Sequence, residues 1–71
     1  LTAGRGTNVT GPTAGTPVAI PHGLGVAPAF IYITPRGQGG VYLTGPSDDT
    51  NFYVAATVNG GIAFDWKAEL P

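Results

Sequence analysis

The chain has 71 residues, a formal net charge of −1 at pH 7 and no cysteine, which excludes disulfides, thiolate metal sites and more than one small domain. Only 10% of its residues are charged, against about 25% in an average globular domain, so we expect further copies of the chain to cover part of its surface. The basic residues are far apart in sequence and no apolar run is long enough to span a membrane, so neither nucleic-acid binding nor membrane insertion is expected.

Residues 1–15 are rich in glycine and poor in large apolar side chains. They predict an extended linker or shaft connector, with at most one short strand around residues 7–10. The chain begins with Leu1 rather than methionine, so we expect it to be a piece of a longer protein. A β-domain is expected over residues 16–71.

In the rest of the chain, apolar residues recur with a period of two, which is typical of strands and not of helices. Five segments separated by turn-forming residues show this pattern: 16–20, 29–34, 41–44, 51–58 and 62–70. Asn59-Gly60, between the last two, is typical of a two-residue type I′ hairpin. The pattern predicts an all-β fold, either a small antiparallel β-sandwich or a meander of about five strands.

The alternation also separates the faces of the strands. In segment 62–70, Phe64 and Trp66 share an apolar face, which makes Trp66 a core residue rather than a ligand contact. Segment 29–34 is different, because Ile31 and Ile33 lie on one face while Phe30 and Tyr32 lie on the other. Both faces are apolar, so we expect a second sheet or a neighbouring subunit to cover the outer one.

The only histidine, His22, lies in the stretch IPHGLG. A single histidine without cysteine lacks the further groups that catalysis or metal binding needs. We therefore predict a turn in which the His22 ring bonds to a backbone carbonyl, while Gly23 and Gly25 adopt positive φ. The alternative is a metal held by His22 from three copies at a symmetry axis.

Two loops, 35–40 and 45–50, are the predicted ligand-binding regions, because exposed loops on rigid sheets commonly carry binding. Their polar side chains can hydrogen-bond a glycan and nearby tyrosines can stack on it. The candidate contact residues are Arg36, Gln38, Tyr42, Asp48, Asp49 and Tyr53. For the two aspartates the alternatives are capping of the turn or, with Asn51, binding of calcium.

The stretch TPVAIPHGLGVAPAFIYITP, followed by a glycine-rich loop and NFYVAATVNGGIAFDWKAEL, resembles the small β-domains near the C-termini of bacteriophage tail-fibre and other virion appendage proteins. The resemblance covers residues 16–70 and is carried by PHGLG at 21–25, Pro28 and the pattern F-x-W-x-A-E at 64–69. It implies a homotrimeric part of a virion that attaches to a host-surface glycan or protein. It also implies that the N-terminal segment joins other virion proteins. The His-x-His metal motif of some fibre tips is missing, so neither a metal nor a cofactor is expected.

Two alternatives to host attachment remain. One is a purely structural virion module, for trimerisation, fibre capping or capsid decoration, without receptor binding. The other is a carbohydrate-binding module attached to an enzyme, which fits the β-fold but not the resemblance. An enzyme in its own right is not expected, because one histidine and no cysteine cannot supply a nucleophile, a base and an orienting group.

Overall fold

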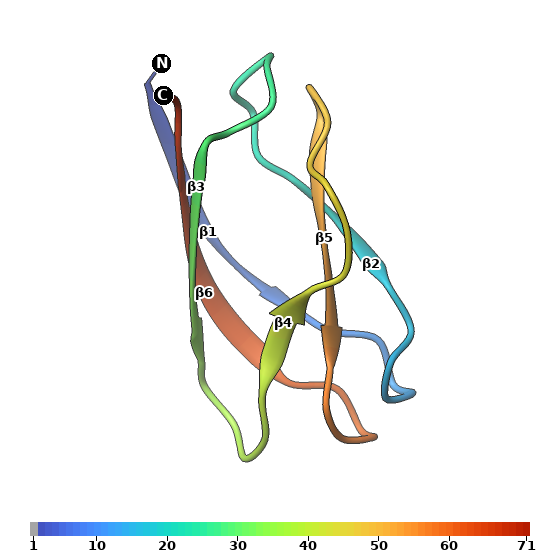
Figure 1. Ribbon diagram of the computed structural model, residues 1–71. Coiled ribbons are helices and arrows are strands. Elements are labelled where there is room, and N and C mark those ends of the chain that lie inside the picture. Colours follow the sequence, from blue (N-terminus) through green and yellow to red (C-terminus); the bar gives the residue numbers. More distant parts are fainter. Residues whose placement is uncertain (1) are drawn as a thin grey trace.

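Alternating apolar side chains give the chain two layers of strands that bury one face each. The computed structural model describes residues 2–71, which form two three-stranded antiparallel sheets packed face to face (Figure 1). One sheet has the order β1-β6-β3, with β1 at Ala3–Val9, β6 at Ala63–Glu69 and β3 at Phe30–Pro35. The other has the order β2-β5-β4, with β2 at Val18–Pro21, β5 at Asn51–Ala56 and β4 at Val41–Leu43. The predicted all-β antiparallel fold is confirmed, and within residues 2–71 there is no helix long and apolar enough to cross a membrane.

The described part of the chain has six strands rather than about five, because the segment expected as a linker contains β1. This strand pairs with β6 along its whole length, from Ala3↔Glu69 to Val9↔Ala63. Its glycines mark close approaches rather than flexibility. A Cβ on Gly6 would lie 3.1 Å from the Trp66 indole, and a Cβ on Gly4 would lie 2.6 Å from a backbone oxygen of another loop.

The predicted type I′ hairpin at Asn59-Gly60 is wrong. Strands β5 and β6 belong to different sheets, so the loop between them crosses from one layer to the other. Gly60 and Gly61 have positive φ, at 99° and 77°, whereas Asn59 does not. The Asn59 side chain instead accepts a hydrogen bond of 2.8 Å from the Ala14 N–H. A meander is also excluded, because among the strands of residues 2–71 only β4 and β5 are consecutive and share a sheet.

The core lies between the sheets. Its buried members are Ile20, Phe52, Val54, Phe64, Trp66 and Ala68. The Phe52 and Trp66 rings meet edge to face, with their centroids 5.1 Å apart. Trp66 is only 7% exposed, and its indole N–H donates a 2.8 Å hydrogen bond to the Asn8 side chain. The predicted core role of Trp66 is therefore confirmed.

The core is less well closed on the side where the edge strands β3 and β4 meet. Ile31, Ile33 and Val41 pack against the core but are only partly buried. Leu43 lies opposite the fully buried Val54 and is still 45% exposed. We call these four side chains, Ile31, Ile33, Val41 and Leu43, the β3–β4 seam. Within this single chain the seam leaves inward-facing apolar surface open to solvent.

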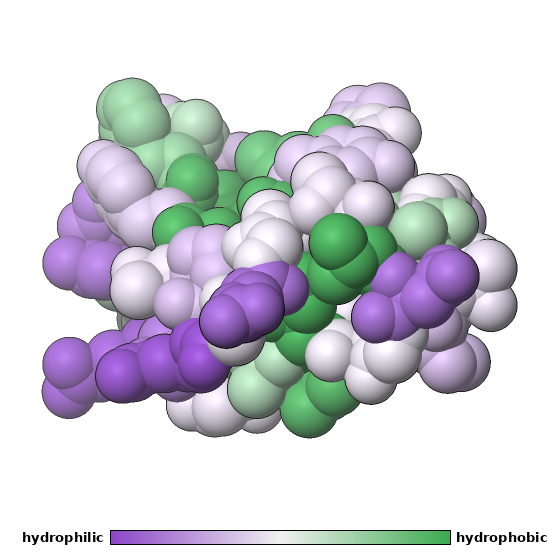
Figure 2. Space-filling model, turned by 90° about the horizontal axis from the view of Figure 1, so that it is seen from below, coloured by the Kyte–Doolittle hydropathy of each residue, from purple (hydrophilic) through white to green (hydrophobic). Residues whose placement is uncertain are grey.

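Apolar surface is also exposed elsewhere. At the end formed by loops 10–17, 36–40 and 57–62, Figure 2 shows hydrophobic surface between hydrophilic groups. Val58, in one of these loops, is 41% exposed, and Val9, at the end of β1, is 59% exposed. On the outer side of β3, Phe30 and Tyr32 are each 53% exposed, so no second layer formed by residues 2–71 covers that side.

Candidate functional site

The outward side of the β1-β6-β3 sheet brings together residues that are far apart in sequence. Arg5 and Tyr32 both lie opposite Lys67, one on each neighbouring strand, and so form a row across the sheet. The next row places Thr7 and Thr34 on either side of Asp65. We call this surface the outer face, made up of Ala3, Arg5, Thr7, Phe30, Tyr32, Thr34, Arg36, Asp65, Lys67 and Glu69. It contains every arginine and lysine of the chain.

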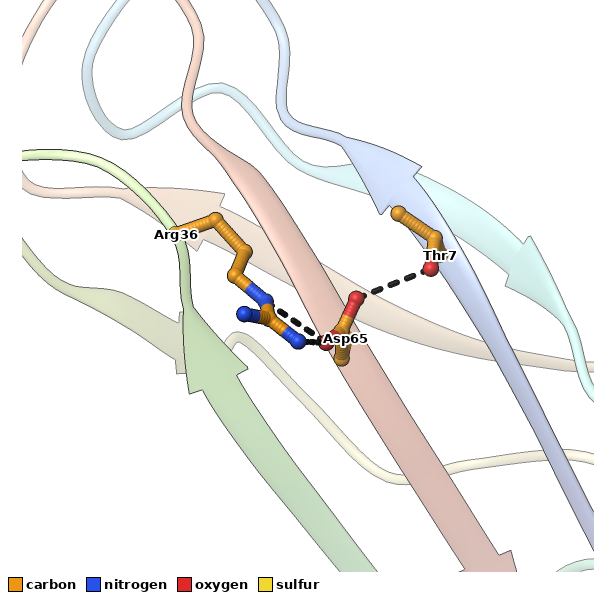
Figure 3. Close-up of polar contacts among 3 residues, drawn as sticks. All are labelled: Thr7, Arg36 and Asp65. Atoms are coloured by element: carbon orange, nitrogen blue, oxygen red, sulfur yellow. Dashed lines mark hydrogen bonds and ion pairs between the residues drawn. The ribbon is translucent and has the colours of Figure 1, made fainter.

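A hydrogen-bonded cluster joins all three strands of this sheet at one end of the outer face (Figure 3). The Arg36 Nε–H donates to Asp65 Oδ2 at 2.6 Å, and a terminal guanidinium N–H donates to the same oxygen. The Thr7 hydroxyl donates to Asp65 Oδ1 at 2.8 Å. These bonds, first that of Arg36 and then that of Thr7, lower the pKa of Asp65. Asp65 is therefore a stable carboxylate that holds Arg36 in place.

The middle of the outer face is open. One shallow hollow is lined by Ala3, Gly4, Arg5 and Lys67. A second is lined by Arg5, Tyr32, Thr34, Asp65, Trp66 and Lys67. Both hollows share Arg5 and Lys67, and Tyr32 is half exposed beside them. Cations, a hydroxyl and an aromatic ring on a rigid sheet suit the binding of a polar ligand with some apolar surface.

The six residues predicted as ligand contacts do not converge on one site. Loops 35–40 and 45–50 lie at opposite ends of the sandwich (Figure 1). Gln38 belongs to the loop at one end and Asp49 to the loop at the other. Tyr42 and Tyr53 lie on the outward side of the β2-β5-β4 sheet, because Tyr42 faces Ala55, which is two residues from Tyr53. Of the six, only Arg36 belongs to the outer face.

Capping of the 45–50 turn is confirmed for Asp48, whereas Asp49 accepts no backbone hydrogen bond from the described residues. Asp48 accepts hydrogen bonds from the backbone N–H groups of Thr50 and Asn51, at 2.9 and 2.6 Å, and from the Tyr53 hydroxyl. The Tyr53 bond, followed by the two backbone bonds, lowers the pKa of Asp48 from 3.8 to about 2. The same bond to Asp48 raises the pKa of Tyr53. Asp49 accepts a bond from the Thr50 hydroxyl. Among residues 2–71, no group of three His, Asp or Glu side chains could hold a metal ion.

His22 has the structural role predicted for it. The ring is only 3% exposed, and its Nε2–H donates to the Asp48 carbonyl at 2.8 Å. Nδ1 accepts from the Leu24 N–H at 3.1 Å, so the proton of the neutral ring is on Nε2. Gly23 and Gly25 have φ values of 72° and 80°. His22 thus fastens its own turn to the 45–50 loop.

Sequence reasoning missed most of the outer face. The period-two pattern places Tyr32 and Lys67 on sides that point away from the core, which was the one available signal. Arg5 was assigned to a linker, and the neighbours of each strand could not be inferred from the pattern. Comparisons of the chain with protein-family models, with curated proteins and with solved structures found no match.

Proposed function

We propose that this chain is a non-enzymatic attachment domain of a homotrimeric virion appendage of the bacteriophage tail-fibre type, and that its outer face binds a host-surface glycan. The observation that carries the binding proposal is the exposure of Phe30 and Tyr32, each 53%, on a rigid sheet beside Arg5 and Lys67. The virion context rests on the resemblance of residues 16–70.

The chemistry of the outer face suits a sugar better than a flat apolar partner. Tyr32 offers an aromatic ring for the apolar face of a pyranose and a hydroxyl for hydrogen bonding. Thr34 and the basic side chains add donors around it. The sheet holds these groups in place before a ligand arrives, which lowers the ordering cost of binding.

Two of the acids, Asp65 on the outer face and Asp48 in the 45–50 loop, suit binding rather than catalysis. Asp65 and Asp48 both have a lowered pKa, because each accepts several hydrogen bonds. Groups of this kind stay ionised near neutral pH and do not suit a general acid, whose pKa should lie near the working pH.

The β3–β4 seam supports the homotrimer. Leu43 is 45% exposed although it lies on the core side of its strand, and burial against a second copy would stabilise the assembly by about 25 cal/mol for each Å² of apolar surface removed from water. Three copies would also present three outer faces, so that weak glycan contacts add up to firm attachment.

Glycan-array and host-cell binding by the 71-residue chain tests the attachment proposal. Tyr32→Ala should weaken binding by about tenfold or more, since stacking and the hydroxyl contact are lost. Tyr42→Ala is the matched variant, because Tyr42 is similarly exposed, at 44%, on the other sheet. The proposal fails if no glycan or cell binds, or if Tyr42→Ala causes the loss and Tyr32→Ala does not.

The second candidate function, a purely structural virion module, is favoured by the seam alone. Sedimentation at micromolar concentration should show a trimer that Leu43→Glu dissociates. Val58→Glu, at a side chain 41% exposed and outside the seam, is its control. A trimer that binds no glycan would leave the structural module as the function, whereas a stable folded monomer would refute both trimeric proposals.

A further inference from the structure

The outer face carries more positive charge than the chain as a whole. Its charged residues are Arg5, Arg36, Asp65, Lys67 and Glu69. Three positive charges and two negative ones leave this face with one net positive charge, although the whole chain is at −1. The difference arises because the other two acids, Asp48 and Asp49, lie in the 45–50 loop of the opposite sheet.

The positive charges are not equally engaged. Arg36 is bound to Asp65, and the Lys67 Nζ lies 3.4 Å from a carboxylate oxygen of Glu69. Within residues 2–71, Arg5 makes no ion pair. Arg5 is exposed near the middle of β1 and lines both shallow hollows. The unmatched positive charge of the face is therefore that of Arg5.

Arg5 is also placed next to a like charge. Thr10 N–H bonds to the Ile62 carbonyl and Leu70 N–H bonds to the Thr2 carbonyl, so even-numbered residues of β1 make the ladder bonds to β6. Arg5 and Lys67 thus form a non-hydrogen-bonded pair, in which the Cα atoms are about 4.5 Å apart and the side chains are close. Like charges in such positions destabilise a sheet. An anion bound between them would reverse this repulsion.

We propose that Arg5 and Lys67 form a subsite for the carboxylate of an acidic polysaccharide, with the carboxylate in the hollows that they share. This inference rests on the proposed glycan attachment and specifies its ligand class. A guanidinium binds a carboxylate through two parallel hydrogen bonds, and the Lys67 ammonium adds a second positive contact. Tyr32 lies directly opposite Lys67 on β3, so a sugar ring that carries the carboxylate can lie on its aromatic ring.

Titration calorimetry of the 71-residue chain with galacturonic acid oligomers, and with the same oligomers as methyl esters, tests the subsite. The esters keep the ring and hydroxyl groups but lose the charge. We expect the acid oligomers to bind at least about tenfold more tightly than the esters. Arg5→Gln should cost the acid oligomers about tenfold in affinity or more, and should leave ester binding unchanged.

Thr16→Asp is the control for net charge, because it lowers the chain's charge by the same amount at an exposed loop residue far from the subsite in sequence. It should leave binding of the acid oligomers within about threefold. Thermal unfolding without ligand gives a second readout. Arg5→Gln should not lower the melting temperature, since it removes a repulsion.

Equal binding of acids and esters, unaffected by Arg5→Gln, would overturn the carboxylate subsite and leave the proposed glycan attachment intact. Equal losses from Arg5→Gln and Thr16→Asp would also overturn it, because the effect would then be one of net charge. A DNA duplex that competes as well as the acid oligomers would show a general polyanion surface instead. Binding to no carbohydrate of any kind would remove the proposed function together with this inference.

Discussion

Replacing His22 by alanine should destabilise the fold without changing any chemical activity. The ring is 3% exposed and bridges two loops, donating to the Asp48 carbonyl and accepting from the Leu24 N–H. Each group left without its partner costs about 1–3 kcal/mol when buried. Both sites are only partly buried, so we expect a total loss of about 2–4 kcal/mol.

That loss is large for a domain of this size. A stability of about 0.05–0.15 kcal/mol per residue gives about 4–11 kcal/mol for 71 residues. Urea unfolding followed by the fluorescence of Trp66, the only tryptophan, measures the change through the midpoint and slope. All variants are compared at one chain concentration, because an oligomer would make the midpoint depend on it.

Two further substitutions separate the hydrogen bonds. His22→Asn places an oxygen near the position of Nδ1 and so keeps an acceptor for the Leu24 N–H. His22→Gln places a donor near the position of Nε2 and so keeps the bond to Asp48. Each should recover part of the loss. If His22→Ala has the same free energy of unfolding as the natural chain, His22 does not stabilise the fold and the prediction is refuted. Asn and Gln variants no better than alanine would show that ring shape, not hydrogen bonding, matters.

Acid should unfold the chain partly through Asp48, whose pKa is lowered from 3.8 to about 2. Because the pKa of Asp48 is lower in the folded state, its ionised form stabilises the fold at pH values above the unfolded-state pKa, and this contribution is lost as pH falls from 3.8 to about 2. In Asp48→Asn the free energy of unfolding should fall less steeply with pH in this window. An unchanged slope would contradict this role of Asp48. Tyr53→Phe should raise the pKa of Asp48 toward its ordinary value, because it removes the hydrogen bond that lowers this pKa most. An NMR titration of the Asp48 carboxyl carbon measures the pKa, and an unchanged value would contradict this explanation. Gly4→Ala should destabilise the fold by about 1–3 kcal/mol, since its Cβ would lie 2.6 Å from a backbone oxygen. Gly45→Ala meets nothing within 4 Å and is the control, so equal melting temperatures for the two variants would refute the close-approach explanation.

The predicted ligand contacts illustrate what a one-dimensional pattern leaves out. The sequence predicts ligand contacts in both loop 35–40 and loop 45–50, which flank the same strand, β4. A strand that joins two loops holds them at its opposite ends, however, and the structure shows that separation (Figure 1). Gln38 and Asp49 therefore cannot contact one small ligand together.

The sequence by itself determined the local features. Period-two alternation identified the strands from β2 to β6 and the inward side of β6, because neighbouring side chains of a strand point to opposite faces. The surroundings of His22 identified a turn, since only glycines adopt its positive φ angles without strain.

The tertiary structure alone decided which strands are neighbours. Alternation does not state which sheet a strand joins, and the contact of Asn8 with Trp66 joins residues 58 positions apart. The glycines of β1 are typical of a linker in sequence, but in the structure they make room for the His22 carbonyl and the Trp66 indole beside the strand. The pairing of β1 and β3 with β6 in turn brought Arg5, Lys67 and Tyr32 into one row. Strand neighbours are set by long-range packing of the two apolar layers, and no short stretch of the sequence contains that information.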